Sequence, residues 1–202
     1  MNTLALSRFK PRTIFYFALF IFLLSNILFL KGISAAGPTN VSGVIATDTT
    51  WTKENSPYVV QGSLAIGSSL TIDPGVVVKF NDYQANIIVY GTLNASGTAT
   101  EKIYFTSIKD DLADNHDTNN DGSATTPAAG DWSYINASGA GATVNISNGI
   151  VRYGTGLQAR YGTFNLNDSH VYQNAYNNIY VCYGTARRHI EDVDKDGDLD
   201  VV

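Results

Sequence analysis

The sequence has few residues that form cross-links or interrupt secondary structure. It has one cysteine, Cys182, and five prolines among 202 residues. A single thiol excludes an intramolecular disulfide, so stability has to come from burial and from backbone hydrogen bonds. Apolar residues do not recur every three or four positions after Gly37, which argues against a helical fold. No apolar run after Leu30 is long enough to span a bilayer.

Basic residues are scarce outside the N-terminus. Four of the 13 lysines and arginines lie within the first 36 residues, so the rest of the chain carries nine against all 18 acidic residues, a formal charge of −9. Nucleic acids are bound through clustered lysine and arginine, so this balance argues against a nucleic-acid partner. An excess of acids suits divalent cations instead, provided that the acids cluster in sequence.

The first 36 residues have the three parts of a secretory signal. A basic start is followed by an uncharged, apolar run over 13–30 and by the small residues Ser34, Ala35 and Ala36. An uncleaved membrane anchor is the alternative, because these 18 residues nearly span a bilayer. Ser25 and Asn26 interrupt the run, so we expect a cleaved signal peptide over 1–36. The remainder is then secreted or displayed at the cell surface, with no membrane segment of its own.

Short apolar or β-branched runs separated by Gly, Asn and Asp are typical of strands bounded by turns. The runs include 58–60, 70–72, 76–80, 87–90 and 103–106. They predict an all-β fold with little helix.

Two segments of the chain repeat with an offset of twenty residues. When 143–154 is placed over 163–174, apolar residues fall on apolar residues and Asn145 falls on Asn165. A stacked coil requires such a match, because each turn buries its apolar face only against its neighbours. We therefore predict that Val144 lies over Phe164 and Ile146 over Leu166. Asn145 over Asn165 should begin a ladder of side-chain amides at a turn.

Three segments resemble the N-terminal turns of secreted right-handed parallel β-helix repeat proteins: Ser69–Phe80 (SLTIDPGVVVKF), Val89–Gly97 (VYGTLNASG) and Ile103–Ser107 (IYFTS). The segments 117–122 and 127–132 are similar to a loop and re-entry found there. The resemblance implies a right-handed parallel β-helix over 37–185, with an Asp-rich insertion at 110–131. It does not imply one function, because this architecture carries lyases, hydrolases, adhesins and surface proteins without known activity.

Two Asp-rich loops place oxygen-bearing side chains at relative positions 1, 3, 5 and 9, with glycine at position 6. Calcium takes six to eight oxygen ligands, and glycine permits the sharp turn that brings alternate side chains inward. Neither loop has the glutamate at position 12 of an EF-hand, and a solvated polar turn is the alternative for both. The predicted Ca²⁺ ligands are Asp117, Asn119 and Asp121 in the first loop and Asp192, Asp194, Asp196, Asp198 and Asp200 in the second.

The second loop resembles the calcium loop of FG-GAP repeats and, more distantly, a dockerin. We interpret 186–202 as the start of a further module. The sequence stops directly after this acidic loop without a polar cap, so we expect the N-terminal portion of a longer surface protein.

Signals for catalysis are weak. Asp168 is the only acid between Trp132 and His189, whereas glycosidases need two carboxylates. Arg152 or Arg160 as a proton-abstracting base, and Cys182 with His170 or His189 as a nucleophile, are each less plausible than a structural role. We assign no catalytic or cofactor-binding residue other than the calcium ligands.

Six tyrosines lie between residues 153 and 183. They would suit stacking on sugar rings, but the strand propensity of tyrosine is the simpler interpretation.

From the sequence as a whole we expect a non-catalytic extracellular scaffold or adhesion module, stabilised by calcium, with polysaccharide or cell-surface glycans as its partner. The alternative is the N-terminal part of a secreted polysaccharide-degrading β-helix enzyme, either a lyase or a glycosidase.

Overall fold

The computed structural model describes residues 37–176 and 178–188. Within them, the only helix is η2 (Lys53–Asn55), which confirms the all-β class. The strands are β1 (Thr39–Ile45), β2 (Thr49–Trp51), β3 (Tyr58–Ile66), β4 (Ser69–Ile72), β5 (Val77–Phe80), β6 (Asn86–Val89), β7 (Thr92–Ser96), β8 (Ile103–Ser107), β9 (Tyr134–Ser138), β10 (Thr143–Ser147), β11 (Gly149–Arg152), β12 (Gly156–Arg160), β13 (Thr163–Asn167), β14 (His170–Tyr172), β15 (Ile179–Cys182) and β16 (Thr185–Arg188).

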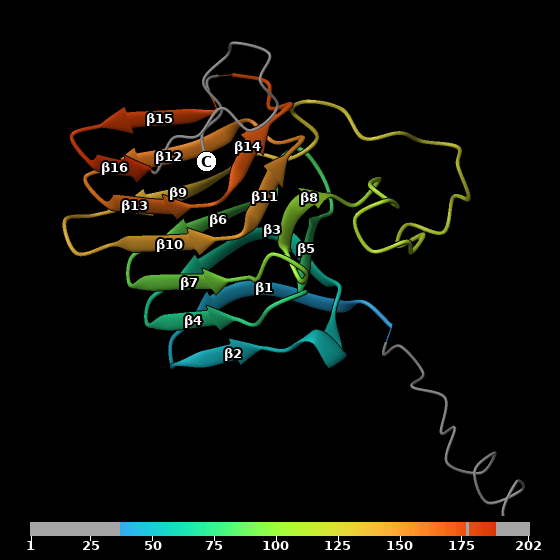
Figure 1. The fold of residues 1–202 in the computed structure, drawn as a ribbon, viewed down its shortest axis with the longest axis horizontal. Helices are drawn as coiled ribbons and strands as arrows, with labels where there is room; N and C mark the ends of the chain where they lie inside the picture. The colour runs from blue at the N-terminus through green and yellow to red at the C-terminus, as the bar shows by residue number, and fades with distance from the viewer. Residues whose placement is uncertain (1–36, 177, 189–202) are drawn as a thin grey trace, which may run out of the picture. The chain divides into compact units, whose positions relative to one another are not determined.

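The strands stack into a parallel β-solenoid (Figure 1). One sheet runs β16-β13-β10-β7-β4-β2, and the other runs β14-β11-β8-β5-β3-β6-β9-β12-β15, with β1 beside β3. The first part of β3 pairs with β5 and the last part with β6, so the longer sheet has two arms. The chain visits the two arms and the six-stranded sheet in turn. Each circuit therefore lies on the one before it, as the repeat predicts.

Inward-facing apolar side chains form one continuous core. Val144 pairs in register with Phe164, and Ile146 pairs with Leu166. All four side chains are buried, which confirms the predicted stacking. Burying one such side chain contributes about 1.5–3 kcal/mol. Repetition of these positions gives the domain its stability without a disulfide.

A ladder of asparagine amides runs across the outside of the six-stranded sheet. Asn145 Nδ2 donates to Asn94 Oδ1, and Asn165 Nδ2 donates to Asn145 Oδ1, both at 2.7 Å. The contact of Asn145 with Asn165 is confirmed, but it lies within β10 and β13 rather than at a turn. The pleat explains this, because Asn145 alternates with the inward Val144 and Ile146 and so projects outward.

Three of the late tyrosines occupy corners between strands. They are Tyr153, Tyr161 and Tyr183, with left-handed φ angles of 66°, 69° and 57°. Strand propensity is therefore the wrong explanation for these three, although Tyr172 and Tyr180 do lie in strands. Each corner tyrosine precedes a glycine that touches the neighbouring turn: a Cβ on Gly162 would lie 2.6 Å from the Cβ of Ala137. Close stacking reserves that position for glycine, and the residue before it makes the bend.

Candidate metal centre

The segment 108–133, which we call the insertion, leaves the solenoid after β8 and returns at β9. Figure 1 shows it as a long loop beside the body of stacked strands. Its return is fixed by Trp132, which is fully buried and stacks on Phe80 with ring centroids 4.0 Å apart. The indole Nε1 donates to the carbonyl of Arg152 at 2.9 Å. The end of the insertion is thereby part of the core.

Lys79 on β5 anchors the middle of the insertion. Its side chain is fully buried, and its ammonium group lies 2.9 Å from Asp114 Oδ1. It also donates to Thr118 Oγ1 at 2.7 Å and to the carbonyl of His116 at 3.1 Å. All three protons of the ammonium group therefore have acceptors, and all three acceptors belong to the insertion.

Two further ion pairs hold the ends of the insertion. Asp110 is buried and accepts from Arg152 through both oxygens, with Nε–Oδ2 at 2.8 Å and Nη2–Oδ1 at 3.0 Å. Asp131 accepts from Lys109 Nζ at 2.8 Å and from the hydroxyl of Ser107 at 2.8 Å. Three acids of the insertion are thus neutralised by cations of the chain itself.

The remaining three acids of the insertion lie close together. Asp111, Asp117 and Asp121 each offer one carboxylate oxygen, and these oxygens lie within 4.8 Å of one another. None of the three forms an ion pair within the described residues. Like charges at this separation repel one another, so the arrangement suits a bound cation.

The loop that carries two of these acids is tightly wound. Both oxygens of Asp117 accept backbone hydrogen bonds, from Asp121 N at 3.1 Å and from Gly122 N at 2.8 Å. Gly122 has a φ of 72°, in the left-handed region that glycine adopts without strain. Asp121 Oδ2 accepts from Asn119 Nδ2 at 2.8 Å and from the hydroxyl of Thr125. These bonds bring the three predicted ligands of the first loop together, with Thr125 beside them.

Several buried oxygens of the insertion accept no hydrogen bond from the described residues. They are Asp111 Oδ1, Asp114 Oδ2, Asn119 Oδ1 and Asp121 Oδ1. All four are acceptors, and three of them belong to Asp111 and to the predicted loop. An unmet buried acceptor costs about 1–3 kcal/mol, and more when it is charged. A cation would satisfy such a set of oxygens directly.

The electrostatics of Asp111 agree with this arrangement. Burial raises the pKa of the Asp111 carboxyl, and the charge of Asp117 raises it further. Lys79 opposes the shift, while Asp121 and Asp114 add to it. The folded protein therefore holds three carboxylates whose charges oppose one another until something neutralises them.

The grouping of the acids was only partly predictable. Asp117 and Asp121 lie together as the loop spacing implies, and Asn119 is hydrogen-bonded to Asp121. Asp111 was not predicted as a ligand. It follows Asp110 directly, and only the fold decides that Asp110 faces Arg152 while Asp111 faces the loop. The second predicted loop, Asp192 to Asp200, lies outside the described residues.

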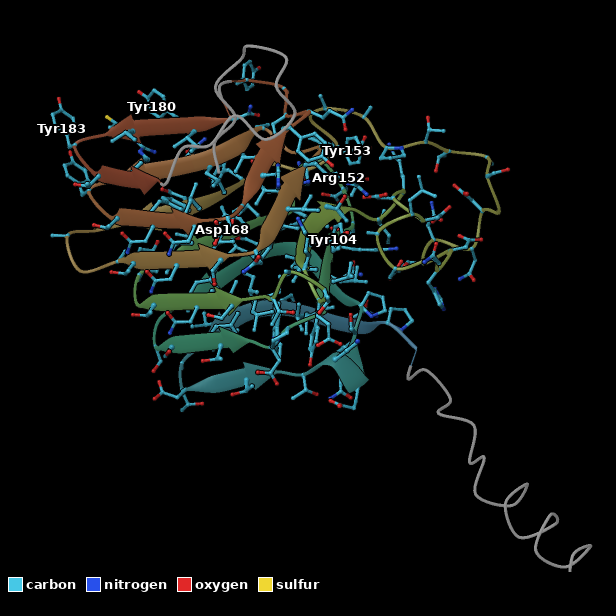
Figure 2. All side chains as sticks on the ribbon, viewed as in Figure 1. Tyr104, Arg152, Tyr153, Asp168, Tyr180 and Tyr183 are labelled. Atoms are coloured by element: carbon cyan, nitrogen blue, oxygen red, sulfur yellow. The ribbon has the colours of Figure 1, made fainter. Side chains whose placement is uncertain are left out.

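Arg152 and Asp168 have structural surroundings. In Figure 2, Arg152 lies between Tyr104 and Tyr153, whose ring centroids are 5.7 and 5.2 Å from its guanidinium carbon. Burial lowers the pKa of Arg152, but hydrogen bonds to Tyr172 and Asp110 outweigh it and the pKa is raised overall. A proton-abstracting arginine needs the opposite shift. Asp168 occupies a left-handed turn after β13, with a φ of 48°.

Comparison with known proteins adds no identification: no family model, curated protein or solved structure matches the chain. Within the described part of the chain, no helix is long and apolar enough to cross a membrane.

Proposed function

We propose that the protein is an extracellular, non-catalytic β-helix scaffold or adhesion module, and that one calcium ion stabilises its insertion. The observation that carries the calcium part of this proposal is the group Asp111, Asp117 and Asp121. Among the described residues, none of these three acids forms an ion pair, whereas the other acids of the insertion, Asp110, Asp114 and Asp131, are each paired with a lysine or an arginine.

Calcium fits the donors better than other metals do. The candidate ligands are carboxylate and amide oxygens, without the histidine or cysteine that zinc and copper prefer. A loop can supply the irregular coordination that calcium accepts, while magnesium requires a near-octahedral shell. Asp111, Asp117, Asn119 and Asp121 would contribute side-chain oxygens, with water completing the shell.

A bound ion would stabilise the part of the insertion before Trp132, because this part buries little apolar surface. Between Ile108 and Asp131 the only buried residues are Asp110 and Thr118, and Leu112 is 83% exposed. Hydrophobic packing therefore contributes little along this segment. Ion pairs hold its ends and its middle, and calcium would fix the loop between them.

Calorimetry tests the site directly. Two predicted ligands of the second loop are first removed with Asp194→Ala and Asp196→Ala, so that only the first predicted site remains. In this background the full-length secreted chain should bind one calcium ion, and Asp121→Asn should abolish the heat of binding because one charged ligand is lost. Asp82→Asn, in a surface turn where the amide oxygen still accepts from Gln84 N, is the matched control. Equal binding by Asp121→Asn and by the control would reject the site.

Location is a separate prediction. The predicted signal segment, 1–36, lies outside the described residues, and its charge pattern supports export. Expression in a secreting host should release a mature form that begins near Gly37. N-terminal sequencing of exported protein checks this, and an intact Met1 on membrane-bound material would favour the anchor instead. We infer that the partner of the exported module is a polysaccharide or a cell-surface glycan.

A further inference from the structure

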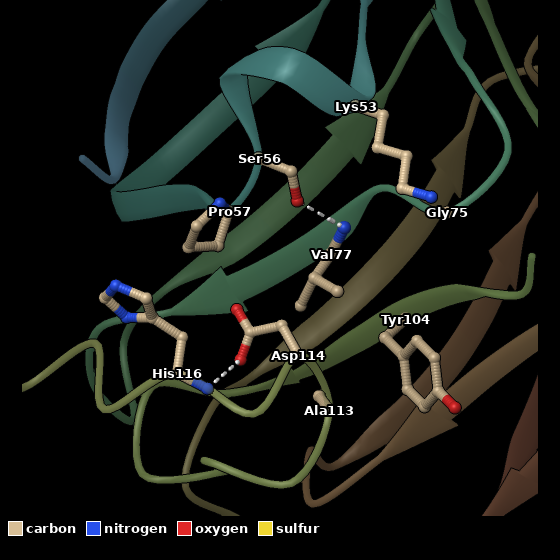
Figure 3. Close-up of a pocket in the computed structure, with 9 residues that line it drawn as sticks. All are labelled: Lys53, Ser56, Pro57, Gly75, Val77, Tyr104, Ala113, Asp114 and His116. Carbon is tan, nitrogen blue, oxygen red and sulfur yellow. Dashed lines mark hydrogen bonds between the residues drawn. The ribbon is translucent and has the colours of Figure 1, made fainter. Parts of the chain in front are cut away.

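A cavity of about 270 Å³ lies between the insertion and the outer face of β5 and β8. Val77 and Tyr104 face it from these strands, and Ala113, Asp114 and His116 face it from the insertion. Ser56, just before β3, closes a further side (Figure 3). None of these residues belongs to the proposed calcium ligands, so the cavity is a separate feature.

Asp114 gives the cavity an acceptor without a donor. Its Oδ1 is occupied by Lys79 Nζ at 2.9 Å and by His116 N at 3.2 Å. Its Oδ2 is buried and accepts nothing from the described residues. In Figure 3 this second oxygen points away from the His116 amide, toward the side of the cavity that Pro57 and Val77 form. A ligand hydroxyl seated against this wall would satisfy it after a small rotation of the carboxylate group.

The other walls add a donor and a flat face. Ser56 Oγ accepts from Val77 N at 2.9 Å, so its own proton remains available to a ligand. Tyr104 presents an aromatic ring, and His116 is exposed at the rim. Together the cavity offers an acceptor, a donor and an apolar surface.

Charge and size limit the ligand. Asp114 is already paired with Lys79, and Lys53 at the edge of the cavity is paired with Glu101 at 2.6 Å. With its charges balanced, the cavity favours a neutral ligand over an ion. Its volume lies below the roughly 300–1,000 Å³ of pockets for drug-sized molecules. One ring that carries several hydroxyl groups has the required size and hydrogen-bonding capacity.

We propose that this cavity binds a neutral polyol the size of one sugar ring. Asp114 Oδ2 accepts from a ligand hydroxyl, Ser56 Oγ donates to the ligand, and the ring lies against Tyr104. The inference deepens the glycan-binding part of the proposed function and rests on it, because it supplies the place where a terminal sugar would be held.

Calcium should strengthen this binding without touching the sugar. The wall from Ala113 to His116 lies in the chain between Asp111 and Asp117, both calcium ligands in the proposed function. Lys79 already holds the middle of this wall, and fixing its two ends as well restrains it further, so the ligand meets a better-formed cavity. Coupling between two sites typically amounts to about 5–150-fold in affinity, and we expect at least the lower end of that range.

The test is saturation-transfer NMR on the full secreted chain with the methyl glycosides of glucose, galactose, mannose and N-acetylglucosamine. In calcium, at least one glycoside should give a signal. Ala113→Phe should abolish it by filling the cavity, and Ser56→Ala should weaken it by removing the donor. Ala124→Phe, at an exposed position elsewhere in the insertion, is the matched control and should retain the signal.

The outcomes separate this inference from the calcium proposal. No signal from any of the four glycosides, or an unchanged signal in both Ala113→Phe and Ser56→Ala, overturns the cavity as a sugar site. Calcium calorimetry on the same samples reports the metal site independently and shows that the variants are folded. A sugar signal that persists in chelator supports the cavity and contradicts its coupling to calcium.

Discussion

Replacing Lys79 by Met is expected to lower the free energy of unfolding by about 3–5 kcal/mol, the usual cost of removing one partner from a buried ion pair. The substitution keeps the length of the side chain but removes the three hydrogen bonds to Asp114, Thr118 and the His116 carbonyl. The carboxylate of Asp114 then remains in a site where its side chain is only 15% exposed. Denaturant unfolding of the purified protein measures the loss.

The matched control is Lys53→Met. Lys53 forms an ion pair with Glu101 at 2.6 Å, but the two side chains are 57% and 46% exposed. Exposed pairs contribute about 0–1 kcal/mol, so this variant should be nearly as stable as the wild type. A second variant, Lys79→Met with Asp114→Leu, removes both charges and should recover part of the loss. If Lys79→Met costs no more than Lys53→Met, the buried ammonium group is not an anchor.

Calcium is expected to raise the melting temperature of the wild-type chain by about 5–10 °C at a concentration a hundred times the dissociation constant. This follows from about 2.7 kcal/mol of binding free energy at that ratio and about 2–4 °C per kcal/mol for a domain of this size. Asp111→Asn should have opposite effects in the two conditions. Without metal it relieves repulsion from Asp117 and raises the melting temperature, and with calcium it removes a ligand and lowers the gain.

The pH dependence of the metal-free protein follows from the raised pKa of Asp111. Below the ordinary pKa of about 4, the carboxyl is protonated in the folded and unfolded chains and favours neither. As the pH rises, the unfolded chain releases this proton first, so folding loses stability until the pH exceeds the raised pKa. The difference in melting temperature between Asp111→Asn and wild type should therefore appear as the pH rises from 4 to 7 in metal-free buffer. Calcium should reverse the sign of this difference in melting temperature.

Asp82→Asn again serves as the control, because it removes a carboxylate far from the group in sequence and keeps its turn. If Asp111→Asn and Asp82→Asn melt alike with and without calcium at pH 7, the three acids are a solvated turn.

The sequence by itself determined the class of fold and the register of its best repeat. Alternation of apolar residues at 143–147 and 163–167 required a buried face, and the twenty-residue offset by itself placed Val144 on Phe164, as the structure has them. Such patterns are readable because inward and outward positions alternate along each strand, and because stacking repeats them from turn to turn. The spacing of Asp117, Asn119 and Asp121 predicted that these residues lie in one tight loop, because the geometry of such a loop depends on residues that are neighbours in sequence.

The tertiary structure decided which acid meets which partner. Asp110 and Asp111 are neighbours of the same type, yet one is paired with Arg152, forty-two residues away, and the other joins the loop. Lys79 lies in a strand where its charge would be expected to face water, but the insertion covers it and supplies its acceptors. These contacts depend on how a long loop folds back over a sheet. Local spacing cannot encode that path, because it is set by the summed hydrogen bonds and charges of residues distant in the chain.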